Sequence, residues 1–179
     1  MLSYNVAKLL RSAPGTVESH PVAVDNLNID EDIRLAKPIE GEVRLAHAGR
    51  SVLARGELST AIEGYCSRCL RPVITPVELE IEEEALPSVD INTGLPVERD
   101  DAADVLRLDD HHELDLETPI REAIMLAEPI AVLCRPDCRG LCLECGLDLN
   151  DNPEHLHGDE RLDPRLAALA DWRNPTDQD

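Results

Sequence analysis

Aromatic side chains are almost absent from this sequence of 179 residues, which has no Phe, one Trp and two Tyr. Hydrophobic residues still make up 42% of the chain, so its core has to be built from Leu, Val, Ile and Ala. Proteins that hold single-stranded nucleic acid by stacking its bases need aromatic platforms. The composition therefore argues against a base-stacking mode of nucleic-acid binding.

Long apolar runs are also missing. No stretch reaches the roughly 18 apolar residues of a membrane-spanning helix, and the start MLSYNVAKLL lacks the apolar run of a secretory leader. We therefore expect a cytoplasmic protein with no membrane partner. Because thiols stay reduced in the cytoplasm, the six cysteines indicate metal ligands or redox groups rather than disulfides.

Two common catalytic signatures are absent. The sequence contains neither a Gly-rich phosphate loop nor a G-x-S-x-G turn. The sequence therefore carries the signature of neither a P-loop nucleotide-binding protein nor an α/β-hydrolase.

Positive charge is scarce, since 17 Lys and Arg stand against 37 Asp and Glu and give a net charge of −20. The imbalance is local: residues 1–77 are neutral, whereas residues 78–117 carry fifteen acids and two bases. A surface of this kind repels phosphate backbones and attracts basic proteins. The acidic segment is either a solvated loop or a surface for a basic partner.

Alternation of apolar and polar residues predicts half-buried strands. The runs that alternate are 42–47, 52–63 and 73–82. The last two runs flank the stretch YCSRCLRP, so we expect Cys66 and Cys69 at the tip of an antiparallel hairpin. Pro76 indicates an edge strand or a bulge, because proline cannot donate a ladder hydrogen bond.

The predicted fold class is α+β: an antiparallel β-sheet or partly closed barrel with a helix and a C-terminal cysteine-rich zinc knuckle. We expect the helix to be capped by Thr118 and to start with Pro119. The predicted parts are a sheet body (1–132) with an acidic loop (about 84–113) and the helix (118–128), then the knuckle (133–150), and a C-terminal helix and tail (151–179).

The cysteines occur in two places. A C-x-x-C turn holds Cys66 and Cys69, and twelve residues of the stretch LCRPDCRGLCLECGLDLN hold the other four. A C-x-x-C turn can direct two thiolates at one metal ion, and a tetrahedral zinc binds four ligands. The favoured set is local, because short loops cost little closure entropy; it is Cys134, Cys138, Cys142 and Cys145.

A second partition stays open. In it, the hairpin pair Cys66 and Cys69 joins Cys142 and Cys145, as in a zinc ribbon, and leaves the other two cysteines aside. His155 and His157 are reserve ligands. A zinc held by four thiolates has no open coordination position, so either site is structural.

Redox alternatives fit the sequence less well. The spacing C-x-x-x-C-x-x-C over Cys138, Cys142 and Cys145 is that of radical iron–sulfur enzymes, but those enzymes need a large barrel. Thioredoxin-like chemistry needs a C-x-x-C at the start of a helix in a βαβ unit, and neither pair has that setting.

Several stretches together resemble a known family. They are YNVAKLLRSAPGT, GELSTAIEGYCSRCLRPV, LEIEEEALP, LCRPDCRGLCLECGLDLN and DPRLAAL. In this order they resemble the YceD family of large ribosomal RNA subunit accumulation proteins, from about residue 4 to residue 170. The motif positions that match are Cys66, Arg68, Cys69, Cys134, Cys138, Gly140, Leu141, Cys142, Cys145, Gly146 and Asn150.

The resemblance implies a non-enzymatic cytoplasmic factor that is needed for accumulation of 23S ribosomal RNA and for biogenesis of the large ribosomal subunit. Its implied partner is 23S rRNA or a pre-50S particle. The resemblance thus implies a protein that is not an enzyme and has no small-molecule substrate, and no catalytic residue is carried over from the family.

Two modes of action follow from the charges. In the first, an arginine-rich part of the sheet and the hairpin turn contact rRNA phosphates; its candidate residues are Arg44, Arg50, Arg55, Arg68 and Arg71. In the second, the protein is an acidic chaperone of a basic large-subunit ribosomal protein and makes no RNA contact.

Overall fold

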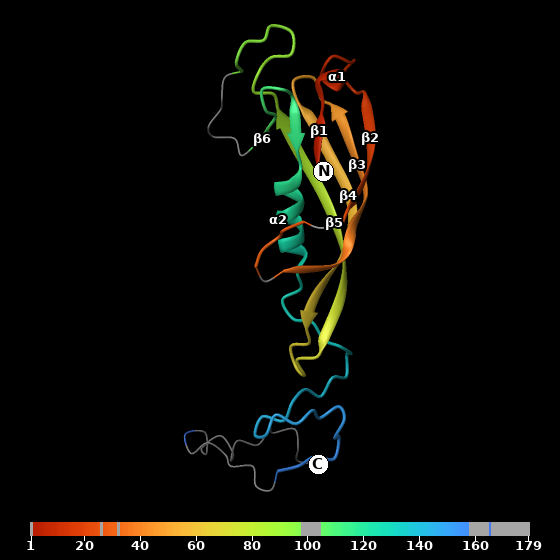
Figure 1. Cartoon of the computed structure of the whole chain (residues 1–179), viewed down its shortest axis with the longest axis vertical. Coiled ribbons are helices and arrows are strands. Elements are labelled where there is room, and N and C mark those ends of the chain that lie inside the picture. The colour runs from red at the N-terminus through yellow and green to blue at the C-terminus, as the bar shows by residue number, and fades with distance from the viewer. Residues whose placement is uncertain (1, 26, 32, 98–104, 158–164, 166–179) are drawn as a thin grey trace, which may run out of the picture.

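The computed structural model of the protein describes residues 2–25, 27–31, 33–97, 105–157 and 165. Two sheets and two helices make up the body (Figure 1). In chain order the elements are β1 (Ser3–Asn5), α1 (Ala7–Leu10), β2 (Val17–Val24), β3 (Arg34–His47), β4 (Val52–Tyr65), β5 (Pro72–Leu86), β6 (Leu106–Arg107), β7 (Glu113–Asp115) and α2 (Glu117–Ala127).

The main sheet has the strand order β2-β3-β4-β5-β6. Its first four strands are antiparallel, and β6 is parallel to the end of β5 at Ala85 and Leu86. The predicted α+β class is confirmed. Of the two predicted alternatives, the described strands form an open sheet with edges at β2 and β6, and a partly closed barrel is not seen; β1 and β7 form a separate two-stranded sheet.

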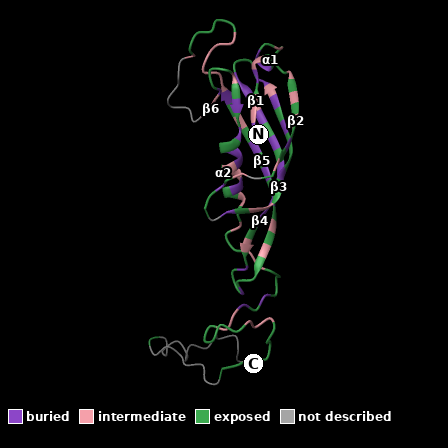
Figure 2. Ribbon diagram, viewed as in Figure 1, coloured by how far each residue is buried: buried purple, intermediate pink, exposed green. Residues whose placement is uncertain are grey.

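Because apolar and polar residues alternate along the strands, one face of the sheet lies in the core. Along β4, Val52, Ala54 and Leu58 are buried, while Arg55 and Glu57 between them are exposed. Helix α2 lies along the inner face and buries Ile120 and Ile124 (Figures 1 and 2). The core is aliphatic, as the composition predicts.

Two local predictions need correction. The amide of Glu117, the first residue of α2, donates to the Asp115 carboxylate at 2.8 Å, so Thr118 is not the cap and lies with Pro119 in the first turn. Strand β2 has no counterpart among the predicted strands, since only Val22 in it is buried and its pattern as an edge strand is weak.

The predicted acidic loop is shorter than expected. Strand β5 continues through Leu86, and a bridge between Val89 and Pro96 orders part of the following turn. Residues 98–104 lie outside the described part of the chain, as does most of the predicted C-terminal helix. No helix among the described residues is long and apolar enough to cross a membrane.

The hairpin of β4 and β5 is confirmed and carries Cys66 and Cys69 at its tip. Around Pro76, β5 pairs with Ala61 of β4 and has no second strand partner in the described part of the chain, as expected of a proline on an edge. The tip points toward the segment 134–157, which we call the cysteine block (Figure 1).

Candidate metal centre

The hairpin tip is a tight turn that aims two thiols to one side. The Leu70 amide donates to the Cys66 carbonyl at 2.9 Å, and the Cys66 amide donates to the Arg71 carbonyl at 2.8 Å. Leu70 closes the turn with a φ of 58°, in the left-handed region that glycine usually occupies. The turn thus brings Cys66 and Cys69 to the same side of the hairpin tip.

The segment after α2 docks against this tip. The Ser67 amide donates to the Val132 carbonyl at 2.8 Å, and the Leu141 amide donates to the Arg68 carbonyl at 3.1 Å. Gly140 has a φ of +78°, and a Cβ built there would lie 3.0 Å from the Arg68 carbonyl oxygen. Glycine at this position therefore permits the close approach.

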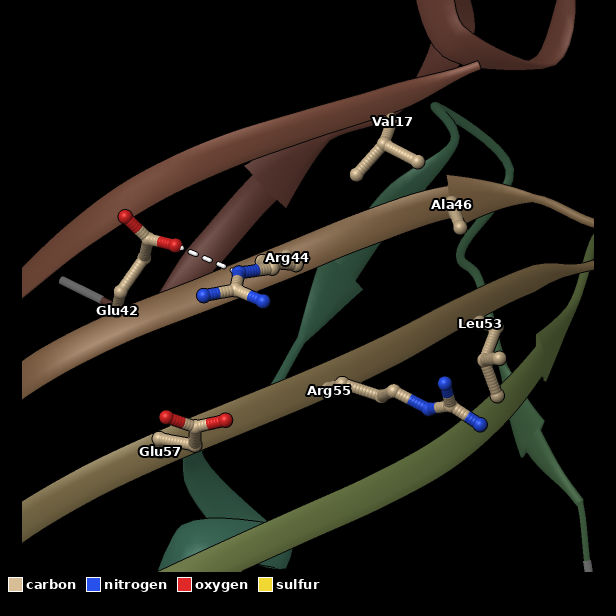
Figure 3. Close-up of a pocket in the computed structure, with 7 residues that line it drawn as sticks. All are labelled: Val17, Glu42, Arg44, Ala46, Leu53, Arg55 and Glu57. Atoms are coloured by element: carbon tan, nitrogen blue, oxygen red, sulfur yellow. Dashed lines mark hydrogen bonds and ion pairs between the residues drawn. The ribbon is translucent and has the colours of Figure 1, made fainter. Parts of the chain in front are cut away.

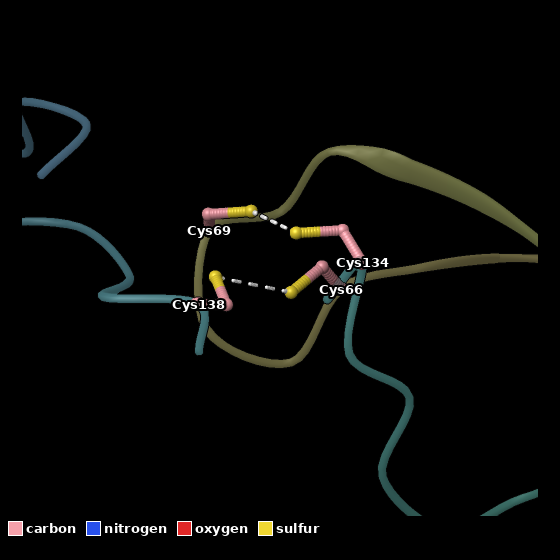
Figure 4. A group of neighbouring side chains, drawn as sticks. All are labelled: Cys66, Cys69, Cys134 and Cys138. Carbon is pink, nitrogen blue, oxygen red and sulfur yellow. Dashed lines mark hydrogen bonds between the residues drawn. The ribbon is translucent and has the colours of Figure 1, made fainter. Parts of the chain in front are cut away.

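This docking gathers four sulfurs (Figure 4). The Sγ atoms of Cys66 and Cys138 are 3.7 Å apart, those of Cys69 and Cys134 are 3.5 Å apart, and all four lie within 4.8 Å of one another. Thiolates about 2.3 Å from a tetrahedral zinc lie about 3.8 Å from each other. The donor set and its spacing fit a four-thiolate zinc site, and three of the four residues are buried.

The thiols differ in how readily they ionise. Hydrogen bonds from the amides of Cys69, Cys134 and Arg68 lower the pKa of Cys66 to about 6. Desolvation of the Cys134 sulfur, together with the neighbouring Cys69 and Cys138 sulfurs, raises the pKa of Cys134 to about 12. The Cys134 residue is exposed, but its sulfur faces the other three. Although desolvation opposes it, hydrogen bonds from the Asn150 side chain and the Gly140 amide also lower the pKa of Cys138. Two of the four thiols thus ionise readily, and four thiolates at this spacing would need a cation to balance their charge.

Asn150 supports Cys138 from outside the four sulfurs. Its Nδ2 atom lies 3.5 Å from the Cys138 sulfur, and its Oδ1 accepts from the Arg139 amide at 2.8 Å. Arg71 forms ion pairs with Asp148, at 2.8 Å, and with Asp151, which anchor the same segment to the hairpin. The Asn150 amide, with a contribution from Arg71, lowers the pKa of Asp148.

The cysteine block has almost no apolar core of its own. Over residues 134–157, only Cys138 and Gly140 are buried, whereas Leu143 and Leu156 are almost fully exposed. A segment that buries so little apolar surface cannot offset its loss of chain entropy by packing. Its fold therefore depends on polar contacts and on the interactions of its cysteines.

The other two cysteines form a second turn with the geometry of the first. The Gly146 amide donates to the Cys142 carbonyl at 2.9 Å, and the Cys142 amide donates to the Leu147 carbonyl at 2.8 Å. Amides of Cys145 and Glu144 lower the pKa of Cys142 to about 6. This turn faces His155 and His157, and the four ligand atoms lie within 4.8 Å of one another.

The structure thus groups the candidate ligands differently from both sequence partitions. It separates Cys134 and Cys138 from Cys142 and Cys145, which the favoured set places around one metal, and it gives the hairpin pair to the first two. Residues 134–138 form a turn and not a helix. Spacing along the chain could not reveal this, because hydrogen bonds between distant segments, from Ser67 and Leu141, decide which cysteines meet.

The five candidate arginines do not share one surface. Arg44 and Arg55 are cross-strand neighbours on the outer face of the sheet, paired with Glu42 at 2.8 Å and with Glu82 at 2.9 Å; Figure 3 shows the first of these pairs. Arg50 lies at the far end of β4, which spans 14 residues, or roughly 40 Å at about 3.3 Å per residue.

Arg68 and Arg71, at the hairpin tip, contact the cysteine block and do not form a joint basic surface. Arg68 Nη1 donates to the Cys138 carbonyl at 2.8 Å, and Arg71 is engaged by Asp148 and Asp151. Both side chains thus position the cysteine block against the hairpin tip.

We predict that Gly140→Ala loosens the cysteine block. The new Cβ meets the Arg68 carbonyl and forces a side chain into the left-handed region, which costs about 1–2 kcal/mol before the clash is counted. Amide hydrogen exchange at Ser67 and Leu141 should accelerate by roughly tenfold or more.

Gly94→Ala is the matched control, because Gly94 has a φ of +68° and a Cβ added to it would meet no atom within 4 Å. It carries the same backbone cost without the clash. Equal exchange at Leu141 in both variants would show that the close approach of Gly140 to Arg68 does not hold the block in place.

Comparison with known proteins places this chain in a family. Residues 54–172 match the family described as "Large ribosomal RNA subunit accumulation protein YceD". Uncharacterized proteins of Mycobacterium bovis and Mycobacterium tuberculosis are each 31% identical over 182 residues, which cover 97% of this chain and 82% of each relative.

A shorter match comes from a plant protein. The "Large ribosomal RNA subunit accumulation protein YCED homolog 1, chloroplastic" of Zea mays is 45% identical over 38 residues, which are 21% of this chain and 13% of that protein. No solved structure matches this chain. The family match spans strand β4, the hairpin tip and the cysteine block, more than half of the sequence, and the chain belongs to the YceD family.

Proposed function

We propose that this protein is a non-catalytic factor needed for accumulation of 23S rRNA and for biogenesis of the large ribosomal subunit. The observation that carries the proposal is the family match over residues 54–172. That region includes the β4–β5 hairpin and the whole cysteine block. The contacts between the hairpin tip and the cysteine block thus lie within the region that matches the family.

We further propose that Cys66, Cys69, Cys134 and Cys138 bind a structural zinc ion. The support is the spacing of the sulfurs and the lack of an apolar core in the block. Zinc supplies a closed tetrahedral link between the hairpin tip and the chain that follows α2. Arg68 and Asn150 hold Cys138 in place around it.

The acidic edge of the sheet suggests the mode of action. Glu78, Glu80 and Glu82 point outward along β5, and together with Glu122 of α2 they line a shallow groove beside this strand. Along this stretch β5 has no second strand partner among the described residues. An extended Lys- or Arg-rich segment of a ribosomal protein fits such an edge, because it adds backbone hydrogen bonds and opposite charge.

The arginines give less support to a direct RNA contact. They are spread over both ends of the sheet, and four of the five pair with acidic groups or a backbone carbonyl. We therefore favour the basic ribosomal protein, bound alone or within a pre-50S particle, over naked rRNA as the first partner.

Depletion of the protein tests the function. We expect the ratio of large- to small-subunit rRNA to fall, because the large subunit fails to accumulate, and a plasmid copy of the protein to restore it. The ratio is read from total RNA by electrophoresis or sequencing depth. An unchanged ratio under complete depletion would remove the proposed role in the large subunit.

Charge variants test the mode of action. Glu78→Gln with Glu80→Gln and Glu122→Gln should weaken capture of a basic ribosomal protein by roughly tenfold, since each exposed ion pair contributes about 0.2–1 kcal/mol. Asp110→Asn with Asp137→Asn and Glu154→Gln is the control, because it removes the same charge from other exposed positions. Capture is measured after nuclease treatment, at two salt concentrations.

Arg44→Gln with Arg55→Gln separates the two modes. It makes the outer face more acidic, so a basic protein binds at least as well, whereas a phosphate contact through these arginines weakens. Loss of rRNA association in this variant, with binding unchanged in the glutamate variant, would favour the RNA mode instead.

Asn150→Ala tests the proposed zinc site without touching a ligand. Removing such a supporting hydrogen bond lowers metal affinity by about 10–100-fold in comparable sites. The control is Asn152→Ala, because the Asn152 side chain donates to the Asp148 carbonyl and contacts no cysteine. Zinc release to a chromogenic chelator is followed together with amide exchange at Leu141; identical behaviour of the two variants would contradict the role of Asn150.

A further inference from the structure

A second group of ligands lies beyond the four-sulfur site. The Cys145 sulfur is 3.3 Å from His155 Nε2, and the Nε2 atoms of His155 and His157 are 3.0 Å apart. With Cys142, these atoms lie within 4.8 Å of one another. Around a tetrahedral zinc, sulfur and nitrogen ligands lie about 3.5 Å apart and two nitrogens about 3.3 Å apart.

The orientation of His157 is informative because its two ring nitrogens face different groups. Nδ1 lies 3.3 Å from the Glu144 carboxylate, and Nε2 faces His155. When the Nδ1–H group donates a hydrogen bond to the Glu144 carboxylate, Nε2 of the neutral ring carries a lone pair directed into the group. A carboxylate that orients a histidine in this way is the usual second partner of a zinc-bound imidazole.

Two facing Nε2 atoms repel unless a proton or a cation lies between them. A shared proton would satisfy only the two histidines and would leave the Cys142 and Cys145 sulfurs without a role. A metal ion satisfies all four at once. The turn that presents these two sulfurs repeats the hydrogen bonds of the hairpin tip, with Gly146 in the position of Leu70.

We propose that Cys142, Cys145, His155 and His157 bind a second zinc ion. Two thiolates and two neutral imidazoles suit a borderline divalent cation such as Zn²⁺, whereas Mg²⁺ and Ca²⁺ prefer oxygen ligands. The second centre is neutral, while the four-thiolate centre carries a net charge of −2. It closes the loop from Cys145 to His155 and stabilises the end of the cysteine block, where the chain buries almost no apolar surface.

The two centres differ in the exposure of their ligands, so they should differ in how fast they lose zinc. Three of the four ligands of the first site are buried, whereas those of the second are exposed or half-buried. Zinc in the second site therefore exchanges and is lost to a chelator before zinc in the first. This inference does not depend on the role of the protein in rRNA accumulation.

Metal content and X-ray absorption of the full chain, reloaded with zinc chloride after metal removal, test the proposal. We expect two zinc ions per chain, with an average first shell of three sulfurs and one nitrogen. His155→Ala with His157→Ala should leave one zinc ion with four sulfurs and no nitrogen. His111→Ala is the control, since its side chain is exposed and outside the site; it should keep both ions.

A rescue variant guards against misfolding of the alanine variant. His155→Cys with His157→Cys should restore the second zinc ion with sulfur ligands only. A single zinc ion with four sulfurs in the unmodified chain, unaffected by the histidine substitutions, would overturn the second site and leave the first standing. No zinc at all would overturn both, whatever the outcome of the rRNA measurement.

Discussion

The arrangement of the cysteine block depends on the contact between the hairpin tip and the segment after α2. This contact brings the Cys69 and Cys134 sulfurs to 3.5 Å across a sequence separation of 65 residues. Ordering a loop of that length has an entropic cost, and the few backbone hydrogen bonds at the tip offset little of it. A zinc ion held by four thiolates would offset this cost, because its binding free energy becomes folding free energy.

The arginines illustrate how charge is used in this fold. In the sequence they gather between residues 44 and 71 and suggest a basic surface. In the structure Arg68 and Arg71 join the hairpin tip to the cysteine block, and Arg44 and Arg55 neutralise glutamates on the outer face. The acidic residues left along β5 then dominate the accessible charge of that edge, and they also discourage two copies of the chain from pairing strand to strand.

The molecule combines two ways of stabilising a chain. The sheet and α2 bury a continuous aliphatic core, in which Ile39, Val43 and Ile120 are fully shielded from solvent. The block from Cys134 to His157 has no such core and relies on its polar contacts and ligand groups. If the proposed zinc ions are bound, their removal would release the block and leave the sheet intact.

Local chemistry in the sequence was enough to predict the last part of β3 (42–47), most of β4 and β5, the hairpin that carries Cys66 and Cys69, the helix near Pro119 and the edge position of Pro76. Each depends on side-chain alternation or on backbone geometry within a few residues. The first part of β3 was not predicted. Strand β2 was not predicted, because an exposed edge strand buries almost none of its side chains and shows no clear alternation.

The choice of partners among six cysteines and two histidines was decided only by the tertiary structure. The low closure entropy of short loops favoured the local set Cys134, Cys138, Cys142 and Cys145. In the structure, however, the segment that follows α2 lies against the hairpin tip, so Cys134 and Cys138 face Cys66 and Cys69. Cys142 and Cys145, which follow the close approach at Gly140, are left to face His155 and His157.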